Sequence, residues 1–131
     1  MRPRASSLLA LLFLALASLP ARAAMDPLCG MNVASDLTLT RDIDCTGLTG
    51  NVLTITANGV TIDGAGHRII APDAAVIVSA SSRTNITIEN LEVSGWCNGV
   101  GISIANSTGV TLQSILANGR TTGVYVENTA R

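Results

Sequence analysis

The sequence predicts an all-β fold in which short strands form a parallel β-helix (solenoid) of about four coils, each of 22–26 residues. Three observations predict it. Two series of alternating segments recur with one period, and turn-forming residues separate the segments. The composition is rich in Val, Ile, Leu and Thr, with one Trp, one Tyr and one Phe in 131 residues. We expect a signal peptide at 1–23, an N-terminal leading segment at 24–35 and the β-helix repeats at 36–131.

The first region, residues 1–23, has the order of features found in a secretory signal peptide. Arg2 and Arg4 give it a positive start, an apolar run covers 8–19, and 21–23 offer a small-x-small cleavage pattern. The apolar run is shorter than the roughly 20 residues that a helix needs to span a bilayer. We therefore expect a secreted or periplasmic protein with no membrane attachment after cleavage.

The mature chain carries few positive charges. Residues 24–131 contain five arginines and nine acidic residues, which gives a net charge of −4. No basic patch remains that could neutralise the phosphates of a nucleic acid, so we expect no nucleic-acid partner. The length of this region is enough for one small domain.

Three cysteines remain in the mature chain. Cys29 and Cys45, 16 positions apart, flank the first predicted strand, and an oxidising compartment favours a disulfide between them. Such a bridge would stabilise the fold by about 3 kcal/mol through the loop that it closes. Cys97 is either a buried small hydrophobic residue or the partner of a cysteine outside this sequence.

The repeat becomes visible when the alternating segments are aligned with one another. The first series consists of Leu37–Leu39, Val60–Ile62, Ile86–Ile88 and Val110–Leu112. The second series consists of Leu53–Ile55, Val76–Val78, Ile102–Ile104 and Val124–Val126. The turn formers that separate them are Asn58-Gly59, Thr84-Asn85 and Thr108-Gly109. Because one coil cannot bury its aliphatic face alone, we expect the coils to stack with equivalent strands paired in parallel.

Three parts of the sequence resemble a known family. They are Gly59–Ile69, Asn85–Gly95, and the stretch around Cys29-Gly30 with Asp36–Thr40 and Asp42–Cys45. These segments resemble the coils of the pectate-lyase-like superfamily, and the resemblance covers about residues 29–131. It implies a right-handed parallel β-helix. It implies no single function, because the superfamily includes polysaccharide lyases, hydrolases and epimerases, surface adhesins, and periplasmic proteins that support copper-site maturation.

The enzymes of that superfamily use recognisable residue patterns. Lyases need acidic calcium ligands with an arginine base, polygalacturonases have paired aspartates and Gly-His-Gly, and alginate epimerases have Asp-Pro-His-Glu. We find none of these patterns in this sequence and assign no catalytic residue. The sequence ends after a predicted strand without a cap, so we expect either a longer β-helix with its active coils further along or another molecule on the open end.

Stacking predicts which side chains become neighbours. Because equivalent positions in a solenoid lie about 4.8 Å apart, the alignment places Thr40, Asp63, Glu89 and Gln113 in one outward column. Asp63 and Glu89 would then be adjacent carboxylates, and such a pair invites a cation such as calcium. The alternative is that both are solvated residues at strand ends whose side chains splay apart. No other cofactor is expected.

One histidine and two aromatic residues are the remaining binding candidates. We expect His67, the only histidine, to pack at a coil corner, because a lone histidine cannot form a metal site. Trp96 at a corner and Tyr125 at an outward strand position could each stack on a sugar ring, or could cover the hydrophobic stack instead.

Three functions from different classes remain. The first, which we favour, is polysaccharide binding or processing, with these coils forming the base of a groove. The second is a non-enzymatic surface or adhesive solenoid. The third, a periplasmic metal-handling scaffold, is disfavoured because Met25, Met31, His67 and the cysteines are few and unclustered.

Overall fold

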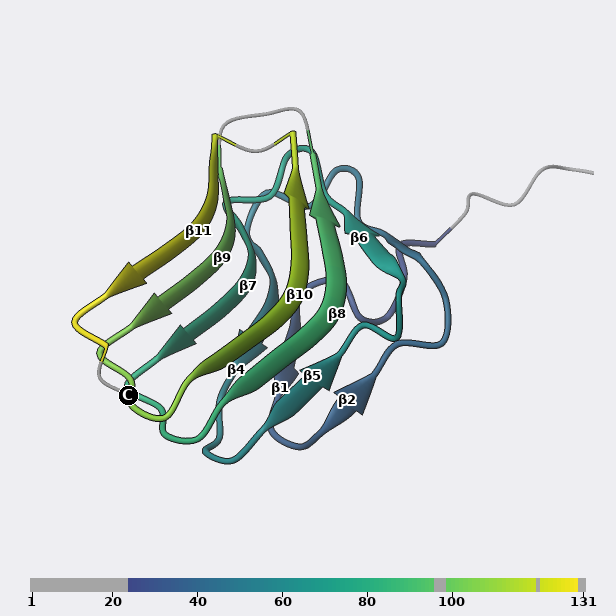
Figure 1. Cartoon of the computed structure of the whole chain (residues 1–131). Coiled ribbons are helices and arrows are strands. Elements are labelled where there is room, and N and C mark those ends of the chain that lie inside the picture. The colour runs from purple at the N-terminus through teal and green to yellow at the C-terminus, as the bar shows by residue number, and fades with distance from the viewer. Residues whose placement is uncertain (1–23, 96–98, 120, 130–131) are drawn as a thin grey trace, which may run out of the picture.

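The computed structural model describes residues 24–95, 99–119 and 121–129, and every regular element within them is a β-strand (Figure 1). The strands are β1 (Met31–Val33), β2 (Leu37–Thr38), β3 (Ile43–Asp44), β4 (Asn51–Ile55), β5 (Thr61–Asp63), β6 (Arg68–Ile70), β7 (Val76–Ser81), β8 (Thr87–Ser94), β9 (Val100–Ala105), β10 (Thr111–Asn118) and β11 (Thr122–Glu127). The predicted all-β class is confirmed. Across these residues we find no helix with the length and hydrophobicity needed to cross a membrane.

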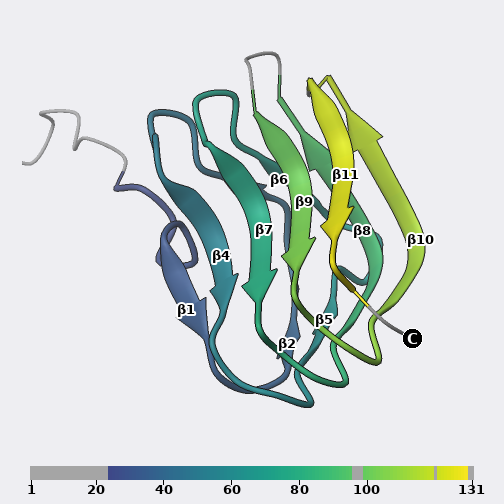
Figure 2. The ribbon, with the colours of Figure 1, turned by 90° about the vertical axis from the view of Figure 1, so that its left-hand side faces the viewer.

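The strands form two parallel sheets, and the chain alternates between them as it winds through the coils (Figure 2). Sheet A has the order β1-β4-β7-β9-β11. In sheet B, β2, β5, β8 and β10 are successive neighbours. The short strand β6 pairs with the second half of β8, and β3 pairs with β6. The result is a β-solenoid of about four turns, which confirms the predicted architecture.

Two of the predicted alignments are shifted by two residues. In sheet B, Asp63 pairs with Thr38 and not with Thr40. In sheet A, Val78 takes the place that the alignment gave to Val76. A shift of two residues leaves every side chain on the same face of the strand, so hydrophobic alternation alone does not distinguish the two registers.

The core is filled by the inward aliphatic side chains of both sheets. In the middle coils Ile62, Ile88 and Ile102 are fully buried, with 0% of their surface exposed. Burial of one such side chain contributes about 1.5–3 kcal/mol. The buried residues from Val33 to Ile104 form one cluster that holds the two sheets together, and partly buried residues of β10 and its approach pack against it.

Sheet B bends in three successive coils, at the equivalent residues Asn90 and Ser114 and, in the coil before them, one residue later at Ala65. Ala65, Asn90 and Ser114 lie at the bend with φ angles of 51°, 52° and 52°, in the left-handed region that turns the chain sharply. Backbone hydrogen bonds continue through the bend, because the N–H of Gly66 donates to the carbonyl oxygen of Asn90 at 2.9 Å. The bend therefore gives sheet B two arms that meet at an angle.

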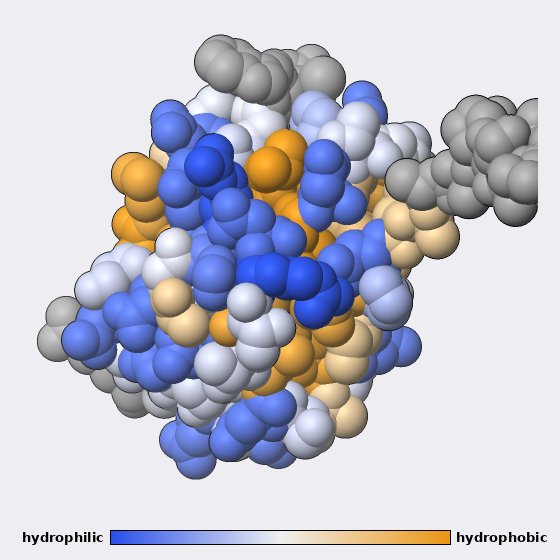
Figure 3. Space-filling view, turned by 90° about the vertical axis from the view of Figure 1, so that its right-hand side faces the viewer, coloured by the Kyte–Doolittle hydropathy of each residue, from blue (hydrophilic) through white to orange (hydrophobic). Residues whose placement is uncertain are grey.

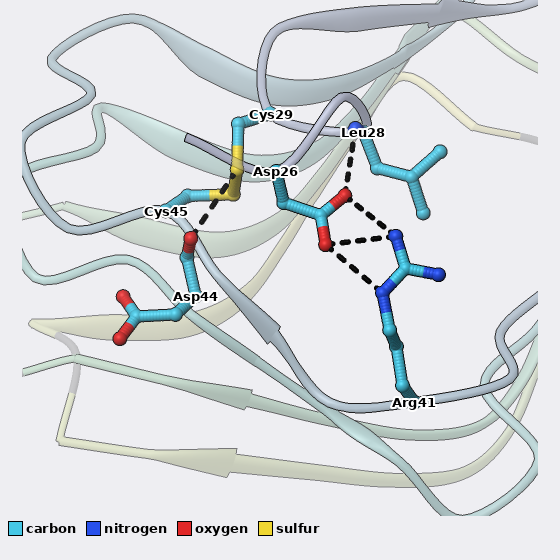
Figure 4. Close-up of polar contacts among 6 residues, drawn as sticks. All are labelled: Asp26, Leu28, Cys29, Arg41, Asp44 and Cys45. Carbon is cyan, nitrogen blue, oxygen red and sulfur yellow. Dashed lines mark hydrogen bonds and ion pairs between the residues drawn. A yellow bond between two sulfur atoms is a disulfide. The ribbon is translucent and has the colours of Figure 1, made fainter. Parts of the chain in front are cut away.

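The first coil is tied to the leading segment by a disulfide and an ion pair (Figure 4). Cys29 and Cys45 form the predicted disulfide, with their Cα atoms 5.5 Å apart. Arg41 binds Asp26 through two nitrogens, with Nη2 2.9 Å and Nε 3.1 Å from Oδ2. The N–H of Leu28 donates to Oδ1 of the same carboxylate at 3.0 Å, and its side chain packs against the core. These contacts fix the leading segment on the first coil.

Candidate functional site

The bend of sheet B forms a pocket on the outside of the solenoid, which we call the sheet-B groove. It has a volume of about 440 Å³ and takes its walls from three successive coils. The residues that line it are Asp63, Ala65, Gly66, Asn90, Leu91, Glu92, Ser114 and Leu116. On the side of the molecule that carries β2, β5 and β6, hydrophilic groups border exposed hydrophobic surface (Figure 3). Because its lining combines carboxylates with the exposed side chain of Leu116, the groove offers both polar and apolar contacts to a ligand.

Only one of the two carboxylate oxygens of Asp63 makes hydrogen bonds within the described part of the chain. Its Oδ1 accepts hydrogen bonds from the N–H of Ala65 at 2.8 Å and from Nδ2 of Asn90 at 3.2 Å. These two bonds fix the chain at the bend in its own coil and in the next. Oδ2 has no hydrogen-bond or ion-pair partner in the described part of the chain, so this oxygen can meet a ligand.

The predicted acidic pair is adjacent in the sheet register. Asp63 pairs with Glu89, and Glu89 pairs with Gln113 one coil further on. Only Asp63 of these three lines the groove. The described residues contain no group of three or more Asp, Glu, His or Cys side chains that could hold a metal ion. Calcium binding by this pair stays a prediction.

Glu92 and Leu116 also line the groove. They are cross-strand neighbours on β8 and β10, and Arg68 on β6 is the neighbour of Glu92 on its other side. Leu116 has 55% of its surface exposed, which is unusual for a leucine in a solenoid built on buried aliphatic residues. A carboxylate and an aliphatic side chain thus stand side by side in the lining of the groove.

Sequence reasoning missed the groove, because it treated each strand as uninterrupted. In β8 the inward residues Ile88 and Leu91 are three positions apart, where a regular strand would place them two apart. Leu112 and Ile115 repeat this spacing in β10, where both pack against the core. The three-residue spacing, with Asn90 and its equivalents inside it, is the signal that could have located the bend.

His67 contacts a carboxylate of the preceding coil. Its Nδ1 lies 3.3 Å from Oδ1 of Asp42, and Nε of Arg68 lies 3.5 Å from Oδ2 of the same group. The hydrogen bond that the Arg68 N–H donates to Asp42, helped by the His67 contact, lowers the pKa of the aspartate below its usual value. His67 thus joins the first two coils at this corner and is not among the residues that line the groove.

Of the two predicted aromatic contacts, Tyr125 does not line the groove. Tyr125 lies on β11 in sheet A, 45% exposed, and its hydroxyl donates to Oε2 of Glu127 at 3.0 Å. This hydrogen bond raises the pKa of Tyr125 above its usual value. Trp96 lies outside the described residues, as does Cys97. Stacking of a sugar on either aromatic ring stays a prediction.

Comparisons with protein-family models, with curated proteins and with solved structures found no match for this chain.

Proposed function

We propose that this protein is an exported member of the pectate-lyase-like superfamily whose sheet-B groove binds a polysaccharide. The pattern of residues 1–23 supports export, and the disulfide between Cys29 and Cys45 is typical of an extracellular or periplasmic compartment. The family assignment is supported by the resemblance of residues 29–131 to the coils of that superfamily, together with the parallel solenoid.

The observation that carries the binding proposal is the composition of the groove wall. Carboxylate oxygens of Asp63 and Glu92, the amide of Asn90 and the hydroxyl of Ser114 are the hydrogen-bonding groups that sugar hydroxyls need. Leu116 supplies an apolar surface for the C–H face of a sugar ring. A volume of about 440 Å³ lies within the usual range of small-molecule sites.

A polymer fits this surface better than a single small molecule. Equivalent positions of successive coils recur about every 4.8 Å along the solenoid, so polar groups such as Asp63, Glu89 and Gln113 follow one another in register. A chain of repeated sugar units can contact several coils at once. We assign the residues that line the groove to binding and assign no catalytic residue.

Binding of the purified protein to a set of polysaccharides, measured by isothermal titration calorimetry, tests the proposal. Leu116→Ser removes the apolar wall at an exposed position, so it is expected to weaken binding about tenfold, which corresponds to about 1.4 kcal/mol. Tyr125→Ser is the matched control, because it removes an exposed side chain from the other sheet. Binding that survives Leu116→Ser and is lost with Tyr125→Ser would contradict the assignment of the site to the groove.

A further inference from the structure

We infer that the sheet-B groove selects glycan chains that carry no carboxylate or sulfate groups. The inference rests on the proposed function, because it names the class of polysaccharide that the groove accepts. It is carried by the charges that line the groove and by the contact of Arg68, the neighbour of Glu92, with Asp42.

Every charged side chain that lines the groove is acidic. Asp63 and Glu92 supply two carboxylates, and the other lining residues are uncharged. In the described part of the chain, neither Oδ2 of Asp63 nor the Glu92 carboxylate has an ion-pair partner. Glu89, the cross-strand neighbour of Asp63, adds a third carboxylate beside the groove. A bound uronate or sulfate would bring another negative charge to a surface that is already negative.

Among the described residues, no arginine forms an ion pair with a carboxylate that lines the groove. Arg68 is the cross-strand neighbour of Glu92, but its Nε lies 3.5 Å from Oδ2 of Asp42, and it does not line the groove. Arg41 is held in an ion pair with Asp26 of the leading segment, and Arg83 lies in the connection between β7 and β8. Proteins recognise carboxylate and sulfate groups mainly through such N–H donors. The described residues place none of them in the groove.

An uncharged chain meets complementary groups at the same positions. Its hydroxyls can donate to Oδ2 of Asp63 and to the carboxylate of Glu92, and hydrogen bonds to ionised acceptors are stronger than those between neutral groups. The Ser114 hydroxyl can donate or accept. Leu116, with 55% of its surface exposed, can pack against the C–H face of a ring without losing a polar contact.

The test compares polymers that share a backbone and differ in charge. Three pairs serve: methyl-esterified and free polygalacturonan, hydroxyethyl and carboxymethyl cellulose, and dextran and carboxymethyl dextran. Titrations with the purified protein are made at low salt with EDTA present. The neutral member of at least one pair is expected to bind, with its charged partner about tenfold or more weaker, and the difference should shrink as salt screens the charges.

Two outcomes would overturn the inference in distinguishable ways. Equal or tighter binding of a charged member contradicts the selectivity and leaves the proposed polysaccharide binding intact. Absence of binding to all six polymers contradicts the proposed function itself, and it therefore also contradicts the selectivity.

A pair of matched variants locates the selectivity. Glu92→Gln keeps the shape of a lining side chain and removes its charge, so the neutral-to-charged ratio of affinities is expected to fall several-fold. Glu127→Gln makes the same change in net charge on β11, away from the groove, and should leave the ratio unchanged. An equal fall in both variants would assign the selectivity to the net charge of the protein and contradict a role for the groove.

Discussion

The first and last described strands of sheet A bury equivalent residues to very different extents. Val33 in β1 and Val126 in β11 are the two ends of one inward column, linked through Ile55, Ala80 and Ile104. Val33 is 1% exposed and Val126 is 51% exposed. Both are valines with the same orientation in the same sheet, so the difference comes from what lies beside them.

At the first coil, side chains of the leading segment and of the coil itself pack against the core. Leu28, Cys29 and Leu48 pack against the core there, and the disulfide with Cys45 holds the segment in place. Among the described residues, no strand pairs with the outer edge of β11. Inward orientation in a solenoid therefore gives burial only where a neighbour covers the position on each side.

Removal of the disulfide is the largest test of this comparison. The double variant Cys29→Ala and Cys45→Ala should lower the free energy of unfolding by about 3 kcal/mol, because the loop between the two positions is no longer closed. Chemical denaturation followed by circular dichroism measures the change. Asp26→Asn is the control: it weakens only a partly exposed ion pair, so a loss below about 1 kcal/mol is expected. An equal loss in both would show that the disulfide has no special part in fixing the first coil.

The two valines themselves give the second test. Val33→Ala removes buried methyl groups and should cost about 2 kcal/mol of unfolding free energy. Val126→Ala, at a position with half of its surface exposed, should cost less than about 1 kcal/mol. The same denaturation experiment measures both. Similar losses in the two variants would mean that both ends of the column are covered to the same degree in solution.

The middle coils are sensitive to a different change. A Cβ atom added at Gly64 would lie 2.4 Å from the carbonyl oxygen of Asn90 and 2.7 Å from Cα of Leu91, so the two coils would have to separate at the bend. Gly64→Ala should cost at least about 1 kcal/mol of unfolding free energy. At Gly50 an added Cβ meets nothing within 4 Å, so Gly50→Ala should change stability by less than about 0.5 kcal/mol. A neutral Gly64→Ala would contradict the close approach of coils at the groove.

The smallest effect concerns a local contact in β11. The hydrogen bond and the negative charge of Glu127 raise the pKa of Tyr125, since both favour the neutral phenol. This is the only tyrosine in the chain, so its ultraviolet absorbance reports it directly. The titration should lie above pH 10.0, the ordinary value, and move towards it in Glu127→Gln. A titration that the variant does not change would show that the contact is absent in solution.

The repeat made much of the fold predictable. Aliphatic alternation at one period identified the parallel solenoid, and cysteine spacing identified the disulfide. The register between the strands was harder to predict. Val76 and Val78 both fit the hydrophobic alternation, so only the turn lengths decide which of them pairs with Leu53. The groove depends on a bend at Asn90 and Ser114 that interrupts the alternation. Leu116 is exposed because it lies outward between the inward Ile115 and Ala117, and this orientation can be predicted only once the bend is located.

The most direct test of the account is the location of a bound glycan on the protein. Backbone amide chemical shifts, recorded while the neutral oligosaccharide that binds most tightly is added, report the contacts residue by residue. The account predicts the largest changes around the bend of sheet B, at Asp63, Asn90, Glu92, Ser114 and Leu116. Changes centred on Tyr125 and β11, with the amides of the groove unmoved, would contradict it.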